Sequence, residues 1–116
     1  MKTDRELLEL AARAAGVRHI EYTNDYDGSR GLMMCNEHGR HTDTWSPLTD
    51  DGDALRLAVK LDIHIKRYAG ATTAQELCST ISFTEHDHWA ENNHDDLAST
   101  RRAIVRAAAA IGEAMQ

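Results

Sequence analysis

The chain has 116 residues, of which 41% are hydrophobic and 28% are charged, so it has the composition of an ordinary folded domain with room for one hydrophobic core. Its formal charge of −6 argues against nonspecific binding to nucleic-acid phosphates, which needs a basic surface. No run approaches the ~20 apolar residues of a membrane span, and we expect the charged start to form a helix rather than a signal peptide. We therefore expect one domain, residues 1–116, in the cytoplasm.

The first predicted helix covers residues 4–15. Thr3 and Glu6 have the spacing of a capping box, in which the threonine hydroxyl caps an early backbone N–H. Leu7 and Leu10 begin an apolar stripe at helical spacing, and Gly16 is placed to end the helix in the left-handed conformation.

Two short strands are expected next, around residues 18–22 and 32–35, joined through a stretch rich in turn-forming residues. The polar segment 36–44, which contains His38 and His41, is expected to be a loop.

A second helix is expected to begin after Pro47, in an acidic stretch whose side chains suit a helix N-terminus. Its capping and first-turn carboxylates are Asp50, Asp51 and Asp53. Its buried stripe is expected to contain Ala54, Leu55, Ala58 and Val59. Trp45 is expected to be a packing anchor at the start of this helix.

The clearest strand is residues 62–68, where apolar and polar residues alternate and Ile63 and Ile65 are expected to face inward. After a turn at 70–73, a fourth strand is predicted over 77–83. Residues 84–96 show no clear period and are expected to form a loop.

A third helix is expected to begin at Asp95 or Asp96, with one apolar face. The predicted order is therefore α-β-β-α-β-β-α, an α/β protein of the α+β type with helices on a mostly antiparallel sheet. One contiguous core is expected, made of Leu7, Leu10, Leu55, Val59, Ile63, Ile65, Ile81, Ile104 and Ile111.

Three blocks of sequence resemble a family of small, uncharacterised bacteriophage and prophage proteins, the phage ABA-sandwich domain. They are residues 7–16, residues 45–61 and the alanine-rich residues 100–109, and the middle block is the most specific. The resemblance implies an α/β/α sandwich, a phage or prophage origin and a host cytoplasm. It implies no activity and assigns no catalytic or ligand residue.

The strongest metal-like feature is the pair His86 and His88, with His94, Asp95 and Asp96 nearby, because imidazole and carboxylate groups suit zinc or another first-row ion. In a strand, the two histidines would lie on the same side. The spacing matches no known motif, however, and zinc usually needs three or four fixed ligands. We therefore expect a solvated acidic loop and no metal or cofactor.

Other chemical motifs fail on spacing. The acidic turn at 50–53 lacks the glutamate of an EF-hand, since position 58 is Ala58, so helix capping is its expected role. Cys35 and Cys78 form no CxxC pair and are expected to be reduced, buried thiols. No P-loop is present, because the glycines at 28–31 are followed by no lysine and no predicted helix.

A basic cluster on the third helix, formed by Arg101, Arg102 and Arg106, is balanced by carboxylates on the same helix and is expected to be a solvated surface. No residue is therefore assigned as catalytic.

These observations predict a non-enzymatic phage accessory protein that binds a protein partner or itself. One alternative is a metal-binding protein or metal-dependent hydrolase that uses the segment from His86 to His94. A second is an acidic decoy that mimics nucleic acid and inhibits a host protein, which 19 acidic residues gathered on one face would favour.

Overall fold

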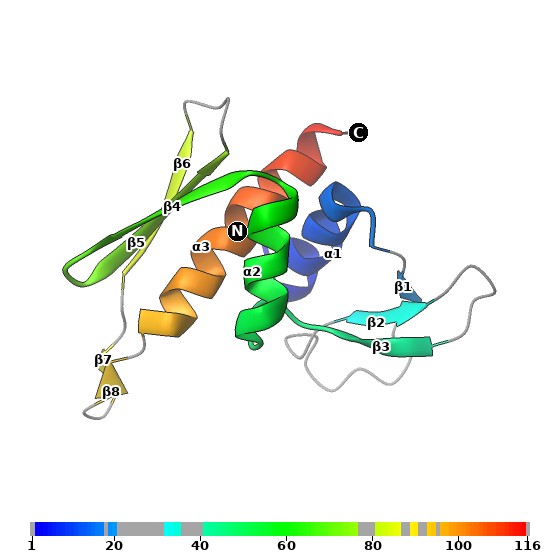
Figure 1. Cartoon of the computed structure of the whole chain (residues 1–116), viewed down its shortest axis with the longest axis horizontal. Helices are drawn as coiled ribbons and strands as arrows, with labels where there is room; N and C mark the ends of the chain where they lie inside the picture. The colour runs from blue at the N-terminus through cyan, green and yellow to red at the C-terminus, as the bar shows by residue number, and fades with distance from the viewer. Residues whose placement is uncertain are drawn as a thin grey trace.

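The computed structural model describes residues 2–17, 19–20, 32–35, 41–76, 81–86, 89–90, 93–94 and 96–115 (Figure 1). Its helices are α1 (Asp4–Ala15), α2 (Asp51–Lys60) and α3 (Asp96–Ala114). Its strands are β1 (His19–Ile20), β2 (Leu32–Cys35), β3 (His41–Trp45), β4 (Ile63–Tyr68), β5 (Ala71–Glu76), β6 (Ser82–His86), β7 (Trp89–Ala90) and β8 (Asn93–His94). No helix of the described part is long and apolar enough to cross a membrane.

Helix α1 begins and ends where the sequence predicts. The Glu6 backbone N–H donates to the Thr3 hydroxyl at 3.2 Å, and that hydroxyl lies 3.2 Å from the Glu6 carboxylate, to which it donates. Gly16 ends the helix with a φ of 71°, in the left-handed region that glycine adopts without a steric penalty. The predicted Thr3 cap and Gly16 terminus are therefore confirmed. The capping box also predicts that Glu6 reaches back to the Thr3 backbone N–H, but its carboxylate accepts from the Thr3 hydroxyl instead.

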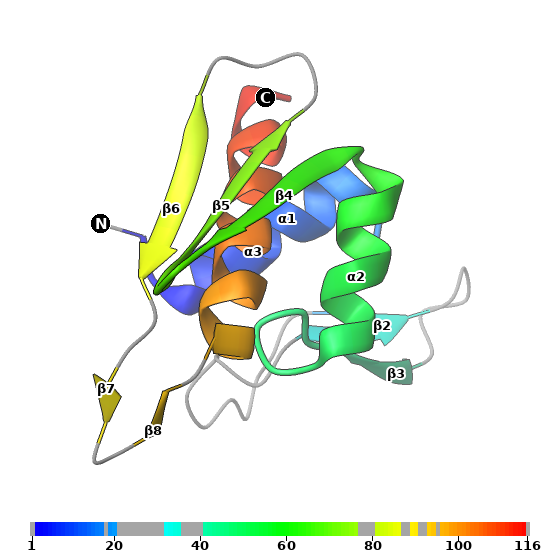
Figure 2. The same cartoon turned by 60° about the vertical axis from the view of Figure 1, so that its left-hand side comes forward.

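Helix α3 is the centre of the fold (Figure 2). It packs against α1 on one side and against the sheet β4-β5-β6 on the other, and α2 lies beside it. Small side chains allow these close approaches, since Ala103, Ala107 and Ala108 of α3 are buried. The alanine-rich segment of the sequence is thus the contact surface between layers.

The sheet β4-β5-β6 is antiparallel, and one face of it lies on α3. The register puts Ile65 opposite Ala74 and Ala74 opposite Phe83, so these residues share the helix-side face. Lys66 and Tyr68 lie on the open face and are exposed. Strands β4 and β5 are joined by a two-residue turn in which Gly70 has a φ of 81°.

Thr72 is the most buried polar residue on the helix-side face. Its hydroxyl accepts a hydrogen bond from Arg67 Nη1 at 2.7 Å and bonds to the Thr100 hydroxyl at 2.8 Å. The Thr100 hydroxyl in turn lies 2.8 Å from the backbone oxygen of Asp96, to which it can donate. A buried hydroxyl is tolerated here because its hydrogen bonds join the sheet to the first turns of α3.

Two smaller sheets complete the described structure. Strands β1, β2 and β3 form an antiparallel sheet in that order, with a register shift between Met34 and Cys35. Strands β7 and β8 form a short antiparallel pair. The expected α+β class, with three helices packed on mostly antiparallel sheets, is confirmed.

The predicted strands are only partly correct. Strand β3 occupies part of the segment expected to be a loop, and β5 begins at the expected turn. The single strand predicted over 77–83 is instead a pair, β5 and β6, on either side of residues 77–80, which lie outside the described residues. The predicted loop at 84–96 contains the end of β6 and the β7–β8 pair. Most residues of β3, β5 and β6 are polar, so ladder pairing and not apolar alternation defines these strands.

The observed core runs from α1 through α3 to α2 and the sheet. Of the predicted core residues, Leu7, Ile63 and Ile104 are buried, and Leu10 and Ile111 pack against the core while partly exposed. The prediction is wrong for four residues, which are exposed: Leu55, Val59, Ile65 and Ile81.

In α2, the observed buried face is rotated about the helix axis relative to the predicted one. Ala54, Leu57 and Ala58 are the buried residues of this helix, a set spaced i, i+3, i+4. Leu55 and Val59 lie on the neighbouring face. Ile65 has the expected inward direction, but β4 is the edge strand, and α3 packs mainly on β5 and β6. Trp45 is buried in the core, as predicted.

Candidate functional site

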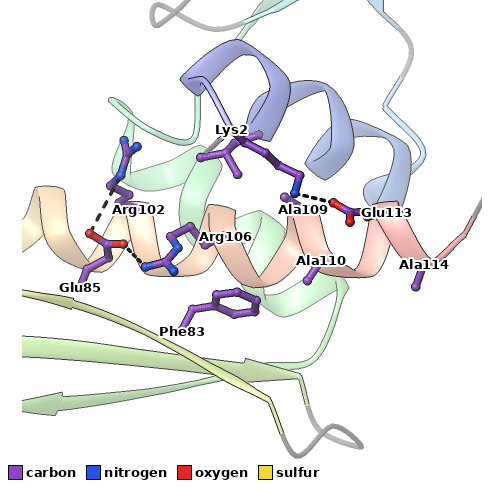
Figure 3. Close-up of a pocket in the computed structure, with 10 residues that line it drawn as sticks. Lys2, Phe83, Glu85, Arg102, Arg106, Ala109, Ala110, Glu113 and Ala114 are labelled. Carbon is purple, nitrogen blue, oxygen red and sulfur yellow. Dashed lines mark hydrogen bonds and ion pairs between the residues drawn. The ribbon is translucent and has the colours of Figure 1, made fainter.

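A groove with a volume of about 690 Å³ lies between α1, α3 and β6 (Figure 3). Its apolar part is formed by Leu7, Phe83, Ala109, Ala110 and Ala114. Its charged part is formed by Lys2, Glu85, Arg102, Arg106 and Glu113. We call it the α1–α3–β6 groove.

Glu85 holds the charged end of this groove. Its side chain is only 14% exposed and accepts a hydrogen bond from Arg106 Nη1, while Arg102 Nε lies 4.0 Å from its other oxygen. Arg102 also pairs with Asp4 of α1 at 2.8 Å. The carboxylate therefore ties β6 to two successive turns of α3.

Arg106 is fixed by three contacts. Besides Glu85, it donates to the backbone oxygen of Thr84 at 3.3 Å, and its guanidinium lies over the Phe83 ring at 5.1 Å. At the other end of the groove, Lys2 Nζ lies 2.7 Å from Glu113. Each cation that lines the groove thus has a carboxylate partner, so the groove offers no uncompensated positive charge to an anion.

A second feature is an exposed apolar surface between α2 and β4. Its members Leu55, Val59 and Ile65 are 61%, 68% and 39% exposed, and together with Ala58 and Ile63 they line one groove of about 350 Å³. Asp62 and His64 complete its lining. We call this the α2–β4 apolar surface.

The predicted histidine site is only partly described. His86 ends β6 and is exposed, opposite Ala71 in the ladder, and His94 lies opposite Trp89 in the β7–β8 pair. His88 and Asp95 lie outside the described residues, as does His38, whereas His41 is in β3. Within the part of the chain described, no group of three or more histidine, cysteine or acidic side chains could hold a metal ion. The metal-binding alternative stays a prediction.

The acidic turn before α2 has the capping geometry that was predicted. Asp50 accepts a hydrogen bond from the Asp53 backbone N–H at 2.8 Å, and Asp53 accepts one from the Ser46 N–H at 3.0 Å. Asp51 makes an ion pair of 2.6 Å with Arg101 of α3. These carboxylates fix the start of α2 and its position on α3.

The arginines of α3 are engaged in contacts between elements, and the expectation of a merely solvated cluster is wrong. Arg101 is mostly buried and donates to the backbone oxygen of Leu48 at 2.8 Å as well as to Asp51. Arg102 and Arg106 meet Asp4 and Glu85. The sequence shows these residues at helical spacing, but their partners are up to 98 residues away in the chain.

Sequence reasoning missed both surfaces. Phe83 and Glu85 are two residues apart on β6, which is the spacing of one strand face, but the strand was predicted to end at Phe83. Leu55 and Val59 were assigned to the core because their apolar character and helical spacing do not say whether a neighbouring element covers them. Cys35 lies in β2, and Cys78 lies outside the described residues.

Comparisons of the chain with protein-family models, with curated proteins and with solved structures find no match. The resemblance to the phage ABA-sandwich family stays a prediction.

Proposed function

We propose that this chain is a non-enzymatic protein that binds a protein partner through the α2–β4 apolar surface. The observation that carries the proposal is the exposure of Leu55, Val59 and Ile65 around one groove. Isolated apolar side chains on a surface are ordinary, but a contiguous group around a hollow is typical of an interaction site. Covering it with protein would remove these side chains from water.

The fold supports this assignment because it leaves the α2–β4 apolar surface rigidly supported. Leu57 is buried on the other side of α2, and Asp50 and Asp53 fix its first turn. A preformed surface loses little conformational entropy when a partner binds. The family resemblance adds a phage accessory role in a host cytoplasm to the proposal.

Four of the described carboxylates argue against the acidic-decoy alternative. Asp4, Asp51, Glu85 and Glu113 lie on different elements, and each is paired with an arginine or lysine. A mimic of nucleic acid needs unpaired negative charge gathered on one face.

The test is capture of partners by the full chain from a lysate of the cell that expresses it, comparing Leu55→Asp/Val59→Asp with Leu97→Asp. Leu97 is a matched control, because it is exposed to a similar extent but lies on α3, outside the α2–β4 apolar surface. We expect the double variant to lose the protein partner and the control to retain it, both with unchanged circular dichroism. Equal capture by both variants would refute the proposal.

A further inference from the structure

Strand β4 presents a sheet edge beside the α2–β4 apolar surface. The described strands pair in the order β4-β5-β6, so β4 has β5 on one side and no described strand on the other. Tyr68 and Ala71 close the two-residue turn and so form a hydrogen-bonded pair. Because this pattern alternates, the backbone groups of Ile63 and Ile65 point away from β5, toward the edge.

Most of the apolar side chains next to this edge are exposed, because α3 packs mainly on β5 and β6. Among the described strands, β4 is the last of its sheet, and Leu55 and Val59 line the same groove as Ile63 and Ile65. Figure 2 shows α2 and β4 diverging from the connection between them. A further strand added to β4 would exchange backbone hydrogen bonds with it and shield this groove from water.

We propose that the added strand is β4 of a second copy of this chain, paired antiparallel about a two-fold axis at His64. The inference rests on the proposed function and names the partner of the same surface. In this register Ile63 lies opposite Ile65 of the second copy on the helix-side face, and the reciprocal pair forms as well. Both are pairs of residues whose backbone groups point to the edge, so they can exchange hydrogen bonds.

Several registers keep the apolar faces of the two copies on the same side, and they differ in the residue at which the two-fold axis lies. The pairing of charged side chains selects one of these registers. An axis at His64 brings Asp62, which directly precedes β4 with a φ of 54°, toward Lys66 of the other copy, twice by symmetry. An axis at Lys66 would oppose two lysines. An axis at Ile65 would place Lys66 opposite His64 and away from Asp62, whereas the axis at His64 places the two His64 side chains opposite each other. Cross-strand pairs of opposite charge stabilise a sheet, and like charges destabilise it.

The register is tested by cross-linking in the full chain carrying Cys35→Ser and Cys78→Ser. In this background we compare His64→Cys with Tyr68→Cys under oxidised glutathione, which takes up the two electrons and two protons released by each pair of thiols. The two 64 positions would form a non-hydrogen-bonded pair with Cα atoms about 4.5 Å apart, within disulfide range. The two 68 positions would be eight residues apart along the ladder, about 27 Å.

We expect a disulfide-linked dimer with His64→Cys and none with Tyr68→Cys. Sedimentation velocity of the unsubstituted chain should show dimers that increase with concentration, and the Leu55→Asp/Val59→Asp variant should lack them. A chain that stays monomeric at all concentrations, or equal cross-linking at both positions, would overturn the inference. A monomer that still loses a different partner through the double variant would leave the proposed function standing, so the two failures are distinguishable.

Discussion

Gly112 of α3 lies directly against the backbone carbonyl of Leu10 in α1. A Cβ atom placed on Gly112 would be 1.9 Å from that oxygen and 2.8 Å from the carbonyl carbon. Both contacts are with backbone, which cannot rotate away as the end of a side chain can. The packing of the two longest helices of the described structure therefore depends on the absence of one side chain.

We predict that Gly112→Ala will destabilise the fold by about 3 kcal/mol, because the helices must separate and lose packing along the whole contact. The matched control is Gly52→Ala in α2, where the nearest atoms belong to the Arg56 and Asp50 side chains. Alanine's higher helix propensity should make that change neutral or stabilising by up to about 0.5 kcal/mol. Urea denaturation of both variants measures the difference, and equal stabilities would contradict the packing argument.

A second prediction compares two leucines of α2. Leu57→Ala should cost about 3 kcal/mol, since the side chain is buried against the core, whereas Leu55→Ala should change stability by less than about 0.5 kcal/mol. Chemical denaturation at low protein concentration is the measurement, so that self-association does not contribute. A larger loss for Leu55→Ala would mean that the sequence-based assignment of the buried face was right.

The sequence predicted the helices well because their signals are local. The Thr3 cap, the Gly16 terminus and the Asp50 cap each act within one turn, and the structure shows all of them. The strands were harder to predict. Strand β5 is built from small and polar residues, and Thr72 is buried only because α3 supplies Thr100 as a hydrogen-bond partner 28 residues later. Such partners are defined by tertiary packing, which no local pattern contains.

The two surface features illustrate the same limit. That Leu55 and Val59 are apolar is visible in the sequence, but whether they are covered depends on where the sheet stops. Similarly, Glu85 reads as one acidic residue in a polar segment, and its two arginine partners lie on a helix 17 and 21 residues further along the chain. The arginines of α3 were expected to be balanced by carboxylates of the same helix, whereas their partners lie on other elements.

A third prediction concerns the cap of α2. Asp50→Ala should lower stability by about 1 kcal/mol, because the Asp53 backbone N–H loses its acceptor. Asp50→Ser should recover most of that loss, since a serine hydroxyl can accept the same hydrogen bond. The melting temperatures of the two variants test this. If binding to a partner is lost while both melting temperatures stay unchanged, the acidic turn is a recognition site and not a cap.

The last prediction concerns Glu85, the carboxylate shared by Arg102 and Arg106. Glu85→Ala would leave Arg106 with the Thr84 oxygen and the Phe83 ring as partners, while Arg102 would keep Asp4. Because Glu85 is largely buried, Glu85→Ala should lower the free energy of unfolding by about 2 kcal/mol. The ion pair between Lys2 and Glu113 is exposed, so Glu113→Ala should cost less than about 1 kcal/mol. Glu85→Gln keeps a neutral acceptor and should fall between the two.

Denaturation at low and high salt separates the contributions, since salt screens the exposed pair more strongly than the buried one. If Glu113→Ala proves as costly as Glu85→Ala, the buried carboxylate does not dominate the joining of β6 to α3.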